Sequence, residues 1–172
     1  MLSDQHSSIP LQLKFLNSCK NDKFSKKKIE ADDKAPLKVA IYNHNNEIIT
    51  SEPFSSMRVH IVPIQGDFDD DHKGQWTEEY FRSKIVTGRR GKEPLLYGDL
   101  YIRLQKGVGY LNTAKFQDNS SFVASKKFKL GVMAVDERIS QRIQEGITES
   151  FAVKDIRGLC KLLLFLFYYQ TL

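Results

Sequence analysis

Residues 37–50, LKVAIYNHNNEIIT, alternate apolar and polar side chains and then pass into a turn. In a β-strand, successive side chains point to opposite faces, so Leu37, Val39 and Ile41 share one face. The turn-forming residues His44-Asn45-Asn46 follow and lead into Glu47–Thr50. This order predicts a β-hairpin with one buried face.

Short runs of apolar and β-branched residues with the same character occur on both sides of this hairpin. The further strands that we expect are Leu11–Phe15, a short strand near Ile29, Met57–Ile64, Leu100–Gln105, Tyr110–Phe116, Lys126–Val135 and Phe151–Lys154. Gly107-Val108-Gly109 predicts a second hairpin. About eight strands at this spacing are typical of an antiparallel sandwich or barrel. Of these we favour a mainly β fold, an antiparallel immunoglobulin-like β-sandwich with one or two short helices.

A short helix is predicted at Trp76–Ser83. Thr77 can cap its N-terminus, and Glu78 and Glu79 suit the positive end of the helix dipole. Trp76, Tyr80 and Phe81 fall at helical spacing. We therefore expect about two turns of helix within an otherwise β-rich chain.

The length of 172 residues fits one domain. We expect a disordered tail at residues 1–10, a β-sandwich module at residues 11–158 and an atypical apolar tail at residues 159–172. The N-terminus shows no secretory signal, and Cys19 and Cys160 lack the spacing of a zinc site or a disulfide framework. These features favour a protein that stays in a reducing compartment inside the cell.

Positive charge is concentrated in a few segments, although the net charge is only +5 at pH 7. The strongest segment contains no acidic residue and holds Arg82, Lys84, Arg89, Arg90 and Lys92. Arginine can grip phosphates or guanine edges, and Gly88 and Gly91 would let a loop approach nucleic acid closely. An ordinary flexible surface loop explains the segment equally well.

A second basic segment holds Lys126, Lys127 and Lys129. On a strand, Lys127 and Lys129 would share the face opposite Phe128 and Leu130, so both lysines are expected to face solvent or phosphate. The lysine-rich stretch at residues 20–28 is interpreted as a solvated connector.

Neither catalysis nor metal binding is expected. Asp67, Asp69, Asp71 and Glu78 occupy ligand positions of an EF-hand loop, but His72 stands where the sharp turn requires glycine. The chain contains no Walker loop, G-x-S-x-G or HExxH motif, and its four histidines accompany no motif-embedded nucleophile. We expect a non-enzymatic protein without a cofactor.

A series of short segments, taken in order, resembles the plant calmodulin-binding-protein-like family. They are KIEADD (28–33), GDFD (66–69), WTEEYF (76–81), GKEPLLYGDL (91–100), GVG (107–109), FQDNSS (116–121), KKFKLG (126–131) and FAVKDIRG (151–158). The match covers about Leu11 to Gly158. It implies a nuclear, sequence-specific DNA-binding transcription regulator acting in plant immunity, salicylic-acid synthesis and stress responses, with promoter DNA and family members as partners.

The chain departs from the family pattern in three places. Phe122 stands where tryptophan is usual, and lysine stands at 126, 127 and 129 where arginine is frequent. After Gly158, the usual polar and basic continuation is replaced by an apolar one, and family members are much longer. We therefore expect a truncated form. The alternative to a DNA-binding function is that the chain acts as a protein-interaction or dimerisation module, which competes with full-length relatives without binding DNA well.

The C-terminal tail does not match the basic, amphipathic helix that calmodulin binds, because Lys161 is its single charge. Leu162–Tyr169 is an unbroken run of eight apolar residues, far short of the roughly 20 that a membrane-spanning helix needs, so no membrane partner is expected. The run is interpreted as either a buried strand or an exposed, aggregation-prone segment, and we favour the exposed segment.

Overall fold

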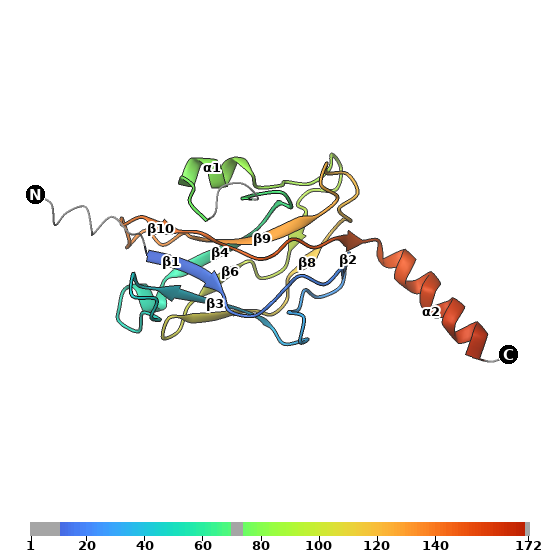
Figure 1. The fold of residues 1–172 in the computed structure, drawn as a ribbon, viewed down its shortest axis with the longest axis horizontal. Coiled ribbons are helices and arrows are strands. Elements are labelled where there is room, and N and C mark those ends of the chain that lie inside the picture. The colour runs from blue at the N-terminus through green and yellow to red at the C-terminus, as the bar shows by residue number, and fades with distance from the viewer. Residues whose placement is uncertain (1–10, 70–73, 171–172) are drawn as a thin grey trace, which may run out of the picture.

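The computed structural model describes residues 11–69 and 74–170, so the tail predicted at residues 1–10 lies outside the described part. Two four-stranded sheets form the two layers of a sandwich (Figure 1). In order, the first holds β10 (Ile143–Gln144), β1 (Leu11–Phe15), β3 (Leu37–Tyr42) and β7 (Val108–Leu111). The second holds β11 (Gly146–Ile147), β9 (Phe128–Ala134), β4 (Arg58–Gln65) and β6 (Tyr101–Arg103). The predicted mainly β fold is confirmed.

Two further strand pairs lie at one end of the sandwich. β5 (Leu96–Tyr97) pairs antiparallel with β8 (Lys115–Phe116), and β2 (Lys23–Phe24) pairs parallel with β12 (Val153–Lys154). β1 and β10 are also parallel, whereas the longer pairings are antiparallel. The parallel pairs join segments that are distant in sequence. Alternation within one strand could not predict which strand it pairs with.

The core lies between the inner faces of the two sheets. Leu37, Val39 and Ile41 are fully buried there, as their alternation predicts. β4 and β9 form the longest ladder, which runs from Val59 opposite Ala134 to Gln65 opposite Phe128. Each fully buried aliphatic side chain contributes about 1.5–3 kcal/mol, so these central strands supply much of the folding free energy.

The predicted second hairpin is only partly correct. Gln105 and Val108 exchange backbone hydrogen bonds of 2.8 and 3.1 Å across a tight turn in which Lys106 and Gly107 both have positive φ. However, β6 pairs with β4 and β7 pairs with β3, so the turn crosses from one layer to the other. The strand predicted near Ile29 is replaced by β2 and an isolated bridge between Lys28 and Lys115.

The helix α1 (Glu78–Ser83) covers the outer face of the second sheet. Thr77 caps it as predicted, because its hydroxyl accepts a hydrogen bond of 3.1 Å from the Tyr80 N–H. Phe81 packs in a second apolar cluster with Val62, Ile64 and Phe68. A Cβ on Gly131 would lie 2.7 Å from the Phe81 ring, so the glycine allows α1 to approach β9 closely.

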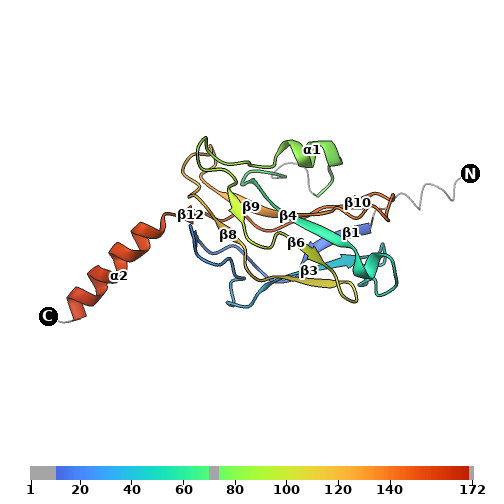
Figure 2. The ribbon, with the colours of Figure 1, turned by 180° about the vertical axis from the view of Figure 1, so that it is seen from behind.

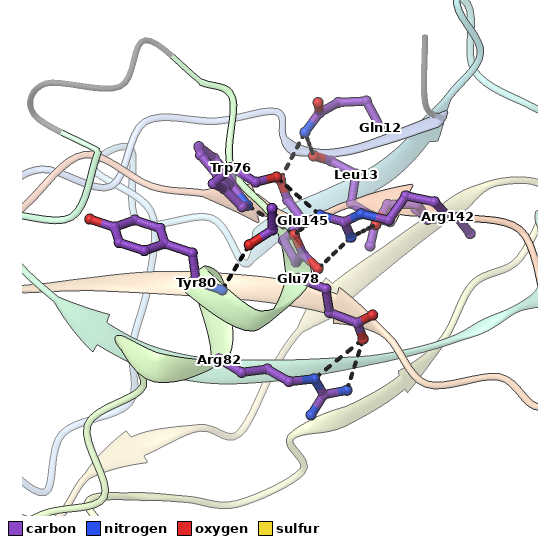
Figure 3. Close-up of polar contacts among 10 residues, drawn as sticks. Gln12, Leu13, Trp76, Glu78, Tyr80, Arg82, Arg142 and Glu145 are labelled. Atoms are coloured by element: carbon purple, nitrogen blue, oxygen red, sulfur yellow. Dashed lines mark hydrogen bonds and ion pairs between the residues drawn. The ribbon is translucent and has the colours of Figure 1, made fainter. Parts of the chain in front are cut away.

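An ionic cluster around the buried carboxylate of Glu145 fixes the chain just before α1 (Figure 3). The carboxylate of Glu145, whose side chain is 3% exposed, lies 2.7 and 2.9 Å from the two terminal guanidinium nitrogens of Arg142. It also accepts a hydrogen bond of 2.9 Å from the indole N–H of Trp76. The side chain of Gln12 donates to the backbone carbonyl of Glu145. The cluster therefore links three segments that are distant in sequence.

The C-terminal segment forms the helix α2 (Ile156–Gln170), which projects away from the sandwich (Figures 1 and 2). Its N-terminus is attached through a hydrogen bond of 3.1 Å from the Ile156 N–H to the Ser25 hydroxyl. The large apolar side chains at residues 162–169 are 48–69% exposed. The buried strand considered for this run is therefore wrong, and the run is a helix of exposed apolar residues. No helix among the described residues is long and apolar enough to cross a membrane.

Candidate nucleic-acid interface

The five basic residues of the segment 82–92 do not form one surface. Arg82 lies in α1 and pairs with Glu78 at 3.2 Å, and the ammonium group of Lys84 lies 5.3 Å from the centre of the Tyr80 ring. The chain then runs from α1 to β5, towards the end of the sandwich from which α2 leaves (Figure 1). Arg90 and Lys92 lie in this connection, and both are exposed.

Arg89 has a structural partner that its sequence position did not reveal. Its guanidinium group makes two hydrogen bonds, of 2.6 and 2.7 Å, to the carboxylate of Asp118, whose side chain is 2% exposed. The same group lies 5.5 Å from the centre of the Phe122 ring. Hydrogen bonding from Arg89 holds the pKa of Asp118 below its usual value, despite burial. Arg89 therefore ties the α1–β5 connection to the loop at residues 118–127.

Replacement of Arg89 should consequently affect stability in a pH-dependent way. Because the folded pKa of Asp118 is depressed, the ion pair stabilises the fold above the ordinary aspartate pKa, and this contribution is lost as pH falls through the folded pKa. We expect Arg89→Ala to unfold at a lower temperature than the parent at pH 7, with the difference shrinking in acid. Arg90→Ala is the matched control. Equal melting of the two variants at pH 7 would contradict the assignment.

The structure corrects the prediction for Lys129. Its side chain was expected to face solvent, but the residue is 8% exposed and its ammonium group donates to the backbone carbonyl of Phe68. The reason is that Phe68 and the α1 cluster cover this outer face of β9. Lys126 and Lys127 are exposed at the start of the strand, and the ammonium group of Lys126 donates to the Ser121 carbonyl at 2.6 Å.

Lysines that were interpreted as a solvated connector instead join the same end of the sandwich. The Lys26 N–H donates to the Phe116 carbonyl at 2.7 Å, and Lys28 pairs with Lys115 across a β-bridge. The Ser25 N–H donates a hydrogen bond of 2.8 Å to the Lys154 carbonyl, which places β12 beside these lysines. Figures 1 and 2 show β2, β8 and β12 gathered where α2 leaves the sandwich.

Hydrogen bonds place the loop at residues 118–127 against the same strands. Ser120 donates from its N–H to the Val153 carbonyl at 2.8 Å and from its hydroxyl to the Lys126 carbonyl at 2.7 Å. Lys92 is close enough to lower the pKa values of Asp118 and Asp155, each of which is lowered mainly by its own arginine partner. We call the resulting surface the basic end. It consists of Lys26, Lys27, Lys28, Arg90, Lys92, Lys115, Lys126 and Lys127.

Ion pairs occupy several of the acidic residues at this end. Asp22 pairs with Lys154 at 3.1 Å, and Asp155 pairs with Arg157 at 3.0 Å. Asp118 is buried against Arg89. The cations of the basic end therefore outnumber the free acids around them, which creates a positive field that attracts polyanions.

Comparison with known proteins gives the family. Residues 11–156 match the family model described as the calmodulin binding protein-like N-terminal domain. The chain belongs to the calmodulin-binding-protein-like family. The resemblance inferred from the short segments is confirmed, and α2 begins where the family match ends.

Several members of the calmodulin-binding-protein-like family are similar over 86% of this chain. Calmodulin-binding protein 60 A of Arabidopsis thaliana is 40% identical over 149 residues, which is 30% of its own length. Calmodulin-binding protein 60 G of Arabidopsis thaliana is 40% identical over 150 residues, 25% of its length. Protein SAR DEFICIENT 1 of the same plant is 31% identical over 150 residues, 32% of its length. The chain thus spans a third or less of these relatives.

Proposed function

We propose that this chain is a sequence-specific DNA-binding module of a plant nuclear regulator of transcription that acts in immune and stress responses. The observation that carries the proposal is the basic end, where cations from four separate segments lie on one surface. Lysine and arginine supply the phosphate contacts that dominate the affinity of proteins for DNA. The nuclear and immune context follows from the family resemblance.

The proposal predicts a strong dependence of DNA binding on salt. About five phosphate contacts would give a slope near −4.5 in a plot of log affinity against log salt, so a fourfold rise in salt would weaken binding about 500-fold. Fluorescence anisotropy with a labelled promoter duplex measures this slope. Specific binding requires that a shuffled duplex bind more weakly at the same salt concentration. A flat salt response, or no binding at low salt, would show that the basic end does not contact DNA phosphates.

The exposed helix α2 favours a second function, association with other proteins. Its eight consecutive large apolar side chains form an exposed patch of the kind that marks interaction sites or aggregation-prone surfaces. The names of the relatives give calmodulin as their partner, and calmodulin binds helices that are both apolar and basic. α2 has only two charges, Arg157 and Lys161, so it lacks the basic face that such a helix presents.

Removal of residues 159–172 should raise solubility and abolish self-association without lowering the unfolding temperature. The reason is that the large apolar side chains of α2 are exposed and add little to the core. Light scattering coupled to size-exclusion chromatography measures the mass of each form, and circular dichroism measures unfolding. A shortened chain that melts markedly earlier would show that α2 stabilises the sandwich.

A further inference from the structure

Residues between positions 21 and 34, in β2 and on both sides of it, line a pocket of 380 Å³ at the edge of the basic end. Lys23, Lys27, Lys28 and Lys34 lie in its wall, together with Glu30 and Asp32. The volume lies within the usual range for small-ligand sites, about 300–1,000 Å³. The pocket is therefore large enough for a phosphate group with part of the molecule that carries it.

The fold holds the wall of the pocket in place. The side chain of Ile29 is buried in the core, and its N–H donates to the Ala114 carbonyl at 2.9 Å. The Lys34 N–H donates to the Ala31 carbonyl at 2.9 Å, which closes a turn. A pocket whose backbone is fixed in this way needs little ordering when a ligand binds.

Two acidic residues at the pocket already have hydrogen-bonding and cationic partners. Asp32 accepts hydrogen bonds from the Lys20 and Asn21 N–H groups and from the Ser18 hydroxyl, all within 3.1 Å. It also lies 3.6 Å from the ammonium group of Lys23. The carboxylate of Asp22 pairs with Lys154. Neither acid is left to repel an incoming anion strongly.

Three lysines at the pocket have no such partner. The side chains of Lys27, Lys28 and Lys34 are exposed and make no hydrogen bond or ion pair with the described part of the chain. Glu30 is the single remaining acid of the lining, so these four residues carry three positive charges and one negative charge. Lysine is a common phosphate ligand that acts as a point charge.

We infer that this pocket binds a phosphate group. Two sources share this chemistry, the phosphodiester backbone of DNA and a free phosphate-bearing small molecule. The bridge between Lys28 and Lys115 makes the pocket continuous with the basic end, so a DNA backbone lying on that end would extend into the pocket. The DNA source rests on the proposed function, whereas the free ligand does not.

Two double variants of the full chain test the inference. Lys27→Gln with Lys28→Gln removes two cations of the pocket and leaves neutral, polar side chains in their place. Lys14→Gln with Lys106→Gln makes the same charge change on β1 and on the turn between β6 and β7. Each variant is titrated with inorganic pyrophosphate, followed by amide chemical shifts in nuclear magnetic resonance, and with a labelled DNA duplex, followed by anisotropy.

We expect saturable shifts confined to residues 21–34 on addition of pyrophosphate, lost in the pocket variant and kept in the control. We also expect the pocket variant to bind DNA about 10-fold more weakly, with a salt slope smaller by about 1–2, and the control to bind as the parent does. Because Lys27 and Lys28 also belong to the basic end, a DNA effect without a pyrophosphate effect assigns the contact to that surface and overturns the pocket. Effects in both titrations identify the DNA backbone as a source, and a pyrophosphate effect alone identifies a free ligand. Equal behaviour of the two variants in both titrations overturns the inference. Failure of the parent to bind DNA at all overturns the proposed function, while the pyrophosphate titration still decides the pocket.

Discussion

Arg142→Ala should lower the free energy of unfolding by about 2–3 kcal/mol, because it leaves the buried carboxylate of Glu145 without its ion-pair partner. Removal of one partner of a fully buried pair costs about 3–5 kcal/mol. The effect expected here is smaller because the side chain of Arg142 is 36% exposed and water can partly replace it. In a chain of this length, the loss corresponds to an unfolding temperature lower by about 5–10 °C.

Arg82→Ala is the matched control for this prediction. Arg82 also pairs with a glutamate, Glu78, but both side chains are about half exposed, so the loss should stay below about 0.5 kcal/mol. Thermal unfolding followed by circular dichroism measures both variants. The double variant Arg142→Ala, Glu145→Ala should lose less stability than the sum of the two single variants, because the two residues act as a pair. Equal melting of Arg142→Ala and Arg82→Ala would show that the cluster in Figure 3 contributes little.

Reversal of three charges at the basic end, Arg90→Glu, Lys92→Glu and Lys127→Glu, should weaken DNA binding about 100-fold or more at moderate salt. Each substitution removes an attraction to phosphate and adds a repulsion, and the salt slope should fall by about 1 for every phosphate contact that is lost. All three side chains are exposed, so the fold should be retained. Arg89 is left intact in this experiment because it holds Asp118.

The control carries the same change in net charge at Lys14→Glu, Arg103→Glu and Lys106→Glu, away from the basic end. Anisotropy titrations at several salt concentrations compare the two sets. An equal loss of affinity in both would mean that DNA responds to the net charge of the protein and not to one surface. An unchanged affinity in the first set would place the DNA contacts elsewhere.

The sequence by itself determined the local elements. The spacing of apolar side chains along the chain matches the repeat of the backbone in a strand or a helix, so it can be read without the rest of the fold. The alternation of Leu37, Val39 and Ile41 predicted the buried face of β3. Thr77 and the two glutamates after it predicted the capped helix α1, although the helix begins at Glu78 and not at Trp76. The order of short segments also identified the family, since many weak matches in a fixed order are specific together.

Local patterns failed where a distant segment decides the environment of a side chain. Alternation placed Lys129 on the face opposite Phe128, but it could not show that Phe68 would cover that face. The run at residues 162–169 is apolar on every side, so periodicity could not separate a strand from a helix. Asp118 lies 29 residues from Arg89, and only the folded chain brings the two together.

Only the tertiary structure decided the candidate interface. The parallel pair of β2 and β12 joins Lys23 to Val153 and thereby brings the lysines at residues 26–28 beside β8, the loop at residues 118–127 and the start of α2. Electrostatic attraction to a polyanion depends on the distance between charges in space, and that distance is set by strand pairing between remote parts of the chain. The sequence therefore determined which residues are basic, and the fold decided which of them share a surface.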